Sequence, residues 1–380
     1  MRAMKAMTNQ RPSASPPPRS GEKLAEALDK LQMSQAELCI RAGRSRKLIN
    51  EIIKGKAQIA PETAYQLELA LGIPAATWNR IETDYQTHLV AERYTAELAE
   101  DLAWLDELPV EAMIDAQWLE PRPTPLEQAR TLLEWFGVAT PQQWRELYRD
   151  PQASIRFSPA FDSDPGALSA WLRAGEKQAY EMDTPSYDRK KFQQALQEIR
   201  GLTREHPTVY QDRMIQLSVD SGVALAFARE LPGMRVAGAS RWLSPRKALI
   251  QLSLLHRTDA DLWFTFFHEA AHILLHGRKM VFVEGVVEGK PSRDDVLEEV
   301  EADHFVANFL APASDLEELR PEGGKGRIQR QAVLAFAARC GLAPGIVVNR
   351  LQHLGWIAPT ELDGLKNQMT WAPAGTYVEL

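Results

Sequence analysis

Hydrophobic residues recur every three to four positions through the first part of the chain. Leu24, Leu28 and Leu31 share one face of such a segment, and glycines follow several of the later segments. This period is typical of amphipathic helices. It predicts short helices over residues 21–31, 35–42, 46–53 and 61–71, followed by one or two long acidic helices over residues 74–108.

Polar residues at the expected helix boundaries agree with this assignment. Ser34 precedes the second helix as an N-cap residue, with Glu37 at the capping-box position, and Gly43 follows that helix as its terminating residue. Ser45 caps the third helix in the same way, and Pro61 suits the first turn of the fourth. Short helices joined by tight turns predict one compact helical domain.

After residue 215, short continuous apolar runs replace the helical period. Such runs are typical of buried strands, and residues 244–246 supply a turn between two of them. A helix capped by Thr258 and ended by Gly277 follows. The predicted elements are strands over 223–227, 235–243 and 247–255, helices over 258–277 and 292–310 with a glycine-rich interruption at 282–291, and mostly helical segments over 109–205 and 328–371.

The composition indicates an ordinary globular protein, with 44% hydrophobic and 25% charged residues. The apolar runs are too short to span a bilayer, and the basic, Ser/Pro-rich N-terminus lacks the apolar stretch of a secretory signal. Cys39 and Cys340 lie far apart, which argues against a disulfide framework and fits a reducing cytoplasm. We therefore expect a cytoplasmic protein without a membrane segment, whose metal ligands, if any, are histidines and carboxylates.

A basic patch coincides with the second and third predicted helices. Residues 41–56 hold six basic residues and one acidic residue, whereas residues 61–120 hold thirteen acidic and two basic residues. In a helix-turn-helix the second helix enters the major groove, and one such unit reads few base pairs, so we expect a homodimer on double-stranded DNA. The alternative is a helical interaction module with an ordinary basic face. The predicted DNA contacts are Gln35, Ser45, Arg46, Lys47, Asn50, Lys54 and Lys56.

The segment DLWFTFFHEAAHILLHG, residues 261–277, contains the pattern His268-Glu269-x-x-His272. An α-helix places residues i and i+4 on one face, so the two imidazoles can converge on one metal ion. Glu269 projects beside them, where a carboxylate can take a proton from water. Large apolar residues flank the motif, so this helix is expected to be buried on nearly every side. The alternative is a buried helix whose histidines bond to backbone or carboxylate groups.

A catalytic zinc site of this kind needs a third protein ligand. The metzincin spacing requires a histidine at position 278, which is Arg278, so that class is excluded. His276 follows His268 by eight residues, and at about 1.5 Å per residue their Cα atoms lie roughly 12 Å apart. We therefore expect His276 to end the helix or to orient a ligand, rather than to bind the same ion.

The helix expected over residues 292–310 offers Glu298, Glu299, Glu301 and Asp303. On a helical projection, Glu299 falls near the middle of the apolar face and Glu301 nearly opposite. A carboxylate on a core face needs a strong partner, so Glu299 is the predicted third ligand. Asp303, one turn away, is a candidate to orient a ligand histidine. The alternative is a solvated charge run, which suits Glu298 and Glu301 well.

Two histidines and a glutamate form a zinc site with an open position for water, with Zn²⁺ as the expected cofactor and Mn²⁺ as the alternative. The reaction class that follows is hydrolysis of a protein or peptide, with Glu269 as the catalytic base. Residues 237–255 are expected to supply an edge strand that pairs with an extended substrate. Candidates for the donor to the developing oxyanion are His256, Arg257, His304 and Tyr377.

These segments resemble two known families. Residues 34–73, SQAELCIRAGRSRKLINEIIKGKAQIAPETAYQLELALGI, look like the Cro/C1-type (Xre) helix-turn-helix. WFTFFHEAAHILLHG and EEVEADHFVANFLAP together resemble the ImmA/IrrE metallopeptidases, with Val306 in place of the usual alanine. The second resemblance also assigns the third ligand to Glu299. It implies a bacterial or phage regulator, because such peptidases are associated with cleaving Xre-type repressors, and some fused members are labelled HigA-like antitoxins.

The elements and resemblances together predict an α+β fold that is mainly α. It comprises an N-terminal five-helix helix-turn-helix domain, a helical middle region, and a C-terminal zincin-like domain with a small sheet and the HExxH helix. The predicted parts are a disordered basic arm (1–19), the helix-turn-helix domain (20–85), a helical connector (86–205), the ImmA/IrrE-like metallopeptidase core (206–315) and a C-terminal helical subdomain (316–380).

Three functional hypotheses follow. The leading one is a DNA-binding transcriptional regulator with a zinc-dependent endopeptidase domain that acts on a repressor-type protein or on its own chain in a stress or mobile-element switch. A second is a non-enzymatic, HigA-like antitoxin or repressor whose metal domain is a sensor or docking module. A third is a housekeeping peptidase with a vestigial helix-turn-helix, which predicts no specific DNA binding even at low salt.

Overall fold

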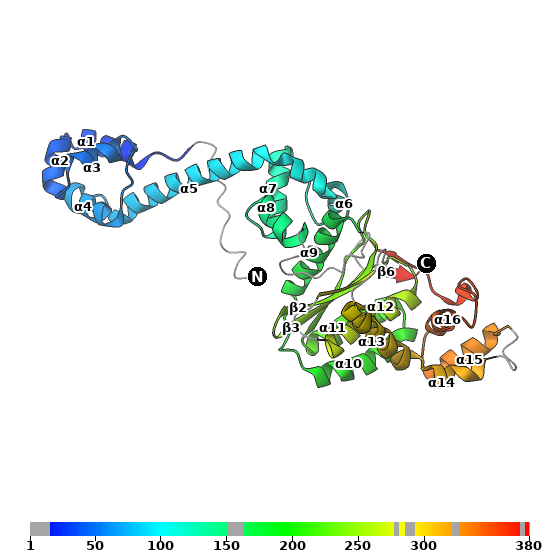
Figure 1. The fold of residues 1–380 in the computed structure, drawn as a ribbon. Helices are drawn as coiled ribbons and strands as arrows, with labels where there is room; N and C mark the ends of the chain where they lie inside the picture. Colours follow the sequence, from blue (N-terminus) through cyan, green and yellow to red (C-terminus); the bar gives the residue numbers. More distant parts are fainter. Residues whose placement is uncertain are drawn as a thin grey trace. The chain divides into compact units, whose positions relative to one another are not determined.

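The computed structural model, drawn in Figure 1, describes residues 16–149, 163–276, 281–285, 293–320, 327–372 and 377–379. The chain divides into two units, Met1–Leu102 and Ala103–Leu380. Many helices and a small central sheet confirm the predicted class, α+β and mainly α. The finer boundaries expected at residues 85, 205 and 315 remain predictions, and residues 1–15 of the expected arm lie outside the described residues.

Five helices build the first unit. They are α1 (Ser20–Lys30), α2 (Gln35–Ala42), α3 (Arg46–Ile53), α4 (Pro61–Leu71) and α5 (Ala75–Glu100). Leu24, Leu38, Ile49 and Leu67, one from each of the first four helices, are buried in a common core that Trp78 joins from the start of α5. The four short helices predicted from the hydrophobic period are therefore confirmed.

Local side-chain bonds define the helix ends in this unit. The Ser34 hydroxyl accepts a hydrogen bond from the Glu37 N–H at 3.1 Å, and the Ser45 hydroxyl accepts one from the Leu48 N–H at 3.2 Å. Gly43 ends α2 with φ at 63°, a left-handed conformation that favours glycine. The predicted caps of α2 and α3 are thus confirmed.

α5 is one continuous helix of 26 residues, where the sequence left one or two helices open. It passes through residue 85, the expected end of the first domain. Residues 91–97 of α5 are exposed on every side. A helix exposed all round is typical of a connector between domains.

The second unit begins with a helical layer and continues into the central sheet. Trp104 and Trp144 are buried there with ring centroids 5.9 Å apart, and Trp135 and Trp171 are also buried. Its short 3-10 or π turns are η1 (Leu102–Glu107), η2 (Arg145–Arg149), η3 (Leu202–Arg204), η4 (Glu317–Leu319) and η6 (Asp363–Leu365). Its α-helices are α6 (Val110–Asp115), α7 (Pro125–Phe136), α8 (Pro141–Trp144), α9 (Pro165–Glu181), α10 (Arg189–Gly201), α11 (Pro207–Asp220), α12 (Asp259–Leu275), α13 (Arg293–Leu310), α14 (Ala313–Leu316), α15 (Arg330–Cys340) and α16 (Pro344–His353).

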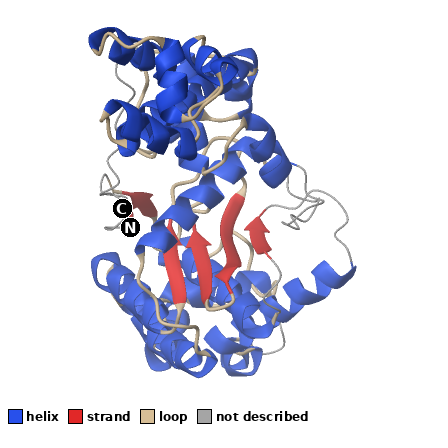
Figure 2. Ribbon diagram, turned by 90° about the vertical axis from the view of Figure 1, so that its left-hand side faces the viewer, coloured by secondary structure: helices blue, strands red, loops and turns tan. Residues whose placement is uncertain are grey.

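The central sheet has the strand order β1-β3-β2-β4, and Figure 2 shows it surrounded by helices. β1 is parallel to β3, whereas β2 is antiparallel to both β3 and β4. The three predicted strands are confirmed, but the expected glycine-rich interruption is wrong for residues 282–285, which belong to the fourth strand. The strands are β1 (Val223–Phe227), β2 (Val236–Ser244), β3 (Lys247–Leu252) and β4 (Val281–Gly285).

The fourth strand also corrects the expected edge of the sheet. Residues 237–255 contain most of β2 and all of β3, and each of these strands has a neighbour on both sides. β2 pairs with β4 from Arg241 opposite Val281 to Val236 opposite Gly285. Both backbone edges of β2 and β3 are therefore occupied, so within the described sheet an extended peptide can add only at β1 or β4.

Alternating side chains of the sheet contact two different layers of helices. Val223, Leu225 and Phe227 belong to a large core that includes α10, α11 and α12. Ala224 and Ala226, between them in β1, face the opposite side and pack with α9. Figure 1 shows these helices on the two sides of the sheet.

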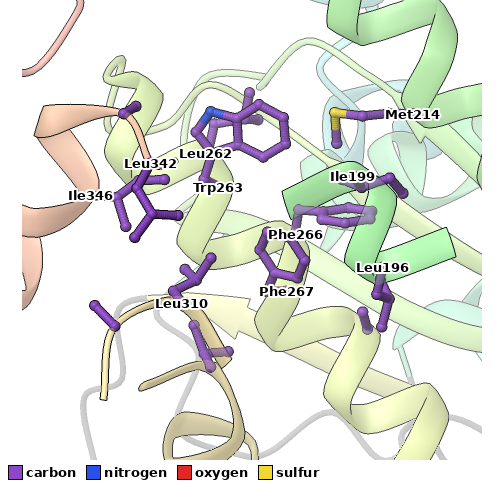
Figure 3. Close-up of a cluster of buried hydrophobic side chains, with 14 of the residues drawn as sticks. Leu196, Ile199, Met214, Leu262, Trp263, Phe266, Phe267, Leu310, Leu342 and Ile346 are labelled. Carbon is purple, nitrogen blue, oxygen red and sulfur yellow. The ribbon is translucent and has the colours of Figure 1, made fainter. Parts of the chain in front are cut away.

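α12 runs through the larger core and is buried on nearly every side, as the sequence predicts. The Thr258 hydroxyl caps its start by accepting a backbone N–H at 3.2 Å, as expected. Phe266 and Phe267 pack among side chains of α10, α11 and α13, as Figure 3 shows. The described helix ends at Leu275, and Gly277, the predicted terminator, lies outside the described residues.

The C-terminal segment adds two helices and a small sheet. α15 ends at Cys340 and α16 begins at Pro344, so the helical segment expected over residues 328–371 is interrupted there. Helix was expected up to residue 371, which is wrong for β5 (Met369–Trp371), the antiparallel partner of β6 (Tyr377–Glu379). Within the described residues no single helix is long and apolar enough to cross a membrane, although α15 and α16 meet those criteria jointly across a bend of 114°.

Candidate metal centre and DNA-contacting surface

Three ligand-type side chains converge between α12 and α13. His268 and His272 lie one turn apart on α12, and Glu299 reaches them from α13. His268 Nε2 lies 3.0 Å from His272 Nε2 and 3.0 Å from Glu299 Oε2, and His272 Nε2 lies 3.7 Å from Glu299 Oε1. The structure thus brings together the three side chains that the sequence predicts as metal ligands.

The spacing of these atoms fits a tetrahedral metal ion. Ligand atoms about 2.0–2.1 Å from a tetrahedral zinc ion lie roughly 3.3 Å from one another. The three distances of 3.0, 3.0 and 3.7 Å bracket that value. Two imidazole nitrogens and one carboxylate are also the donor types that zinc accepts, so His268, His272 and Glu299 fit Zn²⁺ both in spacing and in chemistry.

The outer ring nitrogens of both histidines have partners of their own. His268 Nδ1 lies 3.2 Å from Asp303 Oδ1. His272 Nδ1 lies 2.9 Å from His276 Nδ1, and His276 Nε2 lies 3.2 Å from Glu301 Oε2. For a metal-bound centre, one set of protons satisfies these outer contacts: His268 and His272 donate from Nδ1, while His276 accepts at Nδ1 and donates to Glu301 from Nε2. Both ligand histidines then direct an Nε2 lone pair to the metal position.

The neighbouring acids differ from one another in their surroundings. Asp303 and His276 occupy positions from which they can orient ligand histidines, as the sequence suggests. Glu301 has a side chain that is 63% exposed, yet it bonds to His276, so it is more than part of a solvated charge run. Glu298 is half-buried, which makes the expectation of a solvated side chain wrong for that residue.

Burial and hydrogen bonding control the charge of the ligands. Burial lowers the pKa of His272 to about 4, although hydrogen bonding with Glu299 acts in the opposite direction. Burial by itself raises the pKa of Glu299, but hydrogen bonds with His268 and His272 outweigh it and lower that pKa to about 2. At neutral pH His272 is therefore neutral and Glu299 is charged, which are the forms that bind a cation.

Glu269, the predicted base, is completely buried between α12 and the sheet. The opposing position on β2 is Gly238, where a Cβ atom would clash with Thr265 Cγ2 and would lie 3.0 Å from Glu269 Cγ and 3.1 Å from its Oε1. These contacts are tighter than ordinary van der Waals packing. The absence of a side chain at Gly238 therefore leaves the space that the Thr265 methyl group and the Glu269 carboxylate occupy.

The oxyanion donors considered from the sequence take no clear place at this centre. His256, Arg257 and His304 are exposed. The side chain of Tyr377 lies outside the described part of the chain.

Two residues of α16 approach the centre without having been predicted to do so. The His353 ring centroid lies 6.4 Å from that of Phe264, which in turn lies 6.0 Å from that of His268. Arg350 interacts electrostatically with Asp303, the partner of His268. The signal in the sequence was an arginine and a histidine at helical spacing in the otherwise apolar segment PGIVVNRLQHLGWI.

A second candidate site lies on the first unit. The buried side of α3 is formed by Ile49 and Ile52, with Leu48 and Ile53 half-buried. The opposite side is exposed and basic, as a helix that enters a DNA groove requires. All seven predicted contact residues are exposed: Gln35, Ser45, Arg46, Lys47, Asn50, Lys54 and Lys56.

The matches found among known proteins cover part of the chain. No curated protein matches the chain. Among solved structures, the chain is similar to an antidote protein of a plasmid maintenance system from Nostoc punctiforme, with 26% identity, a TM-score of 0.22, and coverage of 23% of this chain and 94% of that one. It is also similar to an addiction module antidote protein of the HigA family from Coxiella burnetii, with 23% identity, a TM-score of 0.22, and coverage of 23% and 95%.

At these TM-scores the two solved structures indicate nothing about what the whole chain does. The match to a family model is more specific, because it falls on the segment that contains α2, α3 and the exposed basic residues. Residues 24–78 match the helix-turn-helix family model, so this part of the chain is a helix-turn-helix domain of the DNA-binding kind.

Proposed function

We propose that the chain is a DNA-binding regulator whose second unit is a zinc-dependent endopeptidase acting on a repressor-type protein or on its own chain. The observation that carries the proposal is the convergence of His268, His272 and Glu299 beside the buried Glu269. A bound zinc ion would supply Lewis-acid polarisation of the scissile carbonyl. Two histidines and a glutamate leave one position of a tetrahedral site open for the reactants.

Residues of the chain would carry out proton transfer, orient the metal ligands and bind the substrate. Glu269 takes a proton from the attacking water and returns it to the leaving amine. Asp303 and His276 hold the two ligand rings in the orientation that presents Nε2. An extended substrate pairs with the backbone of β4, the edge strand next to β2.

Proteolysis by the full-length protein tests this function. Zinc-loaded wild type and Glu269→Gln would be incubated with helix-turn-helix repressors, and the fragments of every chain present, its own included, would be compared by mass spectrometry. We expect fragments only with wild type, because the variant keeps the metal ligands and loses the base. Equal zinc content of the two proteins is the control, and identical fragment patterns would remove the peptidase from the proposal.

The alternative is a non-enzymatic repressor or antitoxin whose metal centre is a sensor or a docking site, and the helix-turn-helix match of residues 24–78 favours it equally. The two functions respond differently to the same variants. Glu269→Gln leaves the regulatory output of a non-enzymatic repressor intact. Loss of Arg46 and Lys47 removes DNA binding under either function, because both side chains are exposed on α3.

A further inference from the structure

A cavity of about 280 Å³ lies between α12, α15 and the turn η3. Trp263 of α12 and Leu342, both labelled in Figure 3, belong to its wall. Small-molecule sites usually measure roughly 300–1,000 Å³. An apolar cavity of only about 150 Å³ already holds benzene. The space is therefore sufficient for a substituted benzene or a metabolite of similar size.

The cavity and the metal centre lie on opposite sides of α12. An α-helix turns by about 100° per residue, so Trp263 lies roughly 140° around the helix from His268 and roughly 180° from His272. Asp259, which also lines the cavity, precedes Trp263 by one turn and shares its side. The described residues of the cavity wall include none of the metal ligands. A molecule in this cavity would contact the HExxH helix without reaching the metal.

Hydrogen bonds between distant segments fix the cavity walls. Asp259 Oδ1 accepts the backbone N–H of Asn367 at 2.9 Å, and Asp259 Oδ2 accepts the side-chain N–H of Asn367 at 2.9 Å. The Thr203 hydroxyl accepts the backbone N–H of Ala343 at 3.3 Å. All four residues line the cavity, so its shape is largely formed before any molecule enters, as is usual for binding sites.

Trp263 brings a hydrogen-bond donor to this wall. Its side chain is fully buried, and within the described residues its Nε1 has no hydrogen-bond acceptor. Figure 3 shows the indole nitrogen on the side of the ring nearer Leu342, which also lines the cavity. A buried N–H without an acceptor costs free energy, which an oxygen atom of a bound molecule would recover.

The charges around the cavity favour a neutral molecule. The carboxylate of Asp259 lies one turn from Trp263 and repels a second anion placed there. Arg204 and Glu205 also line the cavity, but both are exposed and their charges are opposite. An ammonium or amidinium group has no acceptor for the Trp263 N–H. A neutral carbonyl oxygen meets both conditions.

We propose that this cavity binds a small neutral amphipathic molecule, whose carbonyl oxygen accepts a hydrogen bond from Trp263 Nε1 and whose apolar body packs against Leu334 and Leu342. Leu342 is completely buried and Leu334 is half-buried, so both offer apolar surface at the wall. This binding site is separate from the metal centre. It would serve a peptidase and a non-enzymatic repressor alike.

Three probes of similar shape and different charge test the site. Benzamide is neutral and carries a carbonyl, benzoate is an anion, and benzamidine is a cation without an acceptor. Each would be titrated into the full-length protein with ¹⁵N in the indoles of its ten tryptophans, where Trp263→Phe identifies the Trp263 signal by its loss. We expect benzamide to shift that signal. It should bind about tenfold more tightly than the other two probes, the effect of one buried hydrogen bond.

Two alanines of α15 locate the binding. Ala338 lines the cavity and is exposed, so Ala338→Phe narrows the cavity without disturbing the core. This variant is expected to bind benzamide at least about tenfold more weakly. Ala335→Phe adds the same ring at an exposed position of α15 outside the cavity wall and should bind as wild type does. Unchanged positions of the other indole signals show that both variants fold.

The outcomes decide the proposal without any cleavage assay, so they are distinct from the test of the peptidase. The site is overturned if benzamide leaves the Trp263 signal in place or binds no better than benzoate and benzamidine. Equal binding of benzamide to wild type and Ala338→Phe also overturns it. A Trp263 shift that is lost in Ala338→Phe and kept in Ala335→Phe supports the site.

Discussion

Removing the carboxylate of Asp303 is expected to weaken zinc binding although Asp303 is not itself a predicted ligand. Its Oδ1 lies 3.2 Å from His268 Nδ1, so it fixes the ring and the tautomer that present Nε2 to the metal. Loss of such an orienting carboxylate typically costs 10–100-fold in metal affinity, or about 1.4–2.7 kcal/mol. The structure narrows this expected range of lost zinc affinity. It also predicts which of two acids on α13, Asp303 or Glu301, contributes more to zinc binding.

The contact to His268 is at the long end of hydrogen-bond distances, and the Asp303 side chain is 44% exposed. We therefore expect Asp303→Ala to raise the zinc dissociation constant by about tenfold, near the lower limit. Asp303→Asn keeps a neutral acceptor and should fall between that variant and wild type. Glu301 acts only through His276 and its side chain is 63% exposed, so Glu301→Ala is expected to cost about threefold or less.

Competition with a chromophoric zinc chelator of known affinity would measure these constants. Asp315→Ala is the matched control, because it removes an exposed carboxylate of the same unit whose hydrogen bond comes from Ser314. Melting curves of the metal-free proteins check that the variants fold. A dissociation constant for Asp303→Ala equal to wild type would refute the orienting role. A larger loss in Glu301→Ala than in Asp303→Ala would refute the ranking by contact and exposure.

Three further predictions address the DNA surface, the base and the ligand charge. Arg46→Ala/Lys47→Ala should weaken binding to duplex DNA. It should also reduce the magnitude of the slope of log K against log salt by about two, one for each lost phosphate contact. An unchanged slope in filter-binding measurements would contradict this prediction. Gly238→Ala should destabilise the fold by about 1–3 kcal/mol in urea unfolding, because its Cβ would clash with Thr265 Cγ2 and lie 3.0 Å from Glu269 Cγ. In metal-free protein, burial lowers the pKa of His272 to about 4, so native protein resists protonation that unfolded protein accepts. Relative to His272→Asn, the free energy of unfolding of the wild type should fall by up to about 1.4 kcal/mol per pH unit between pH 6.5 and pH 4. If the unfolding free energies of the two proteins instead change in parallel with pH, His272 does not have this lowered pKa.

Local rules account for what the sequence predicted well. The caps at Ser34 and Ser45 and the left-handed Gly43 depend only on residues within one turn, and the structure shows each of them. Strand β1 was recognisable because five consecutive residues, Val223–Phe227, are all apolar, and the structure buries all five. In each case the residue and its immediate neighbours determine the outcome, so no knowledge of distant contacts was needed.

Strand β4 was missed because its pairing is not local. Residues 281–283 are a short apolar run followed by Glu284 and Gly285, which suits a loop as well as a strand. Pairing with β2, some 40 residues earlier, determines the choice. Because of this long-range pairing, the edge of the sheet is β4 rather than residues 237–255. The expected binding place of an extended substrate changes accordingly.

The proximity of α16 to the metal centre could likewise not be predicted from the sequence. Arg350 and His353 lie far from the HExxH motif along the chain, and only the packing of α16 against α12 brings them near Phe264. An arginine in an apolar segment indicates a buried or functional role, but its partner is set by tertiary structure. Its proximity to Asp303 therefore emerged only from the fold.

The acids of α13 show which side-chain contacts a helical projection of the sequence can predict. An acid on an apolar face must find a partner, and that rule selected Glu299, whose oxygens lie 3.0 Å and 3.7 Å from the two ligand nitrogens. An acid on a polar face is under no such requirement, so the rule is silent about Glu301. Its partner, His276, extends from the end of a different helix and is only 4% exposed. The requirement there belongs to the buried histidine, and the acid that meets it can remain largely in solvent.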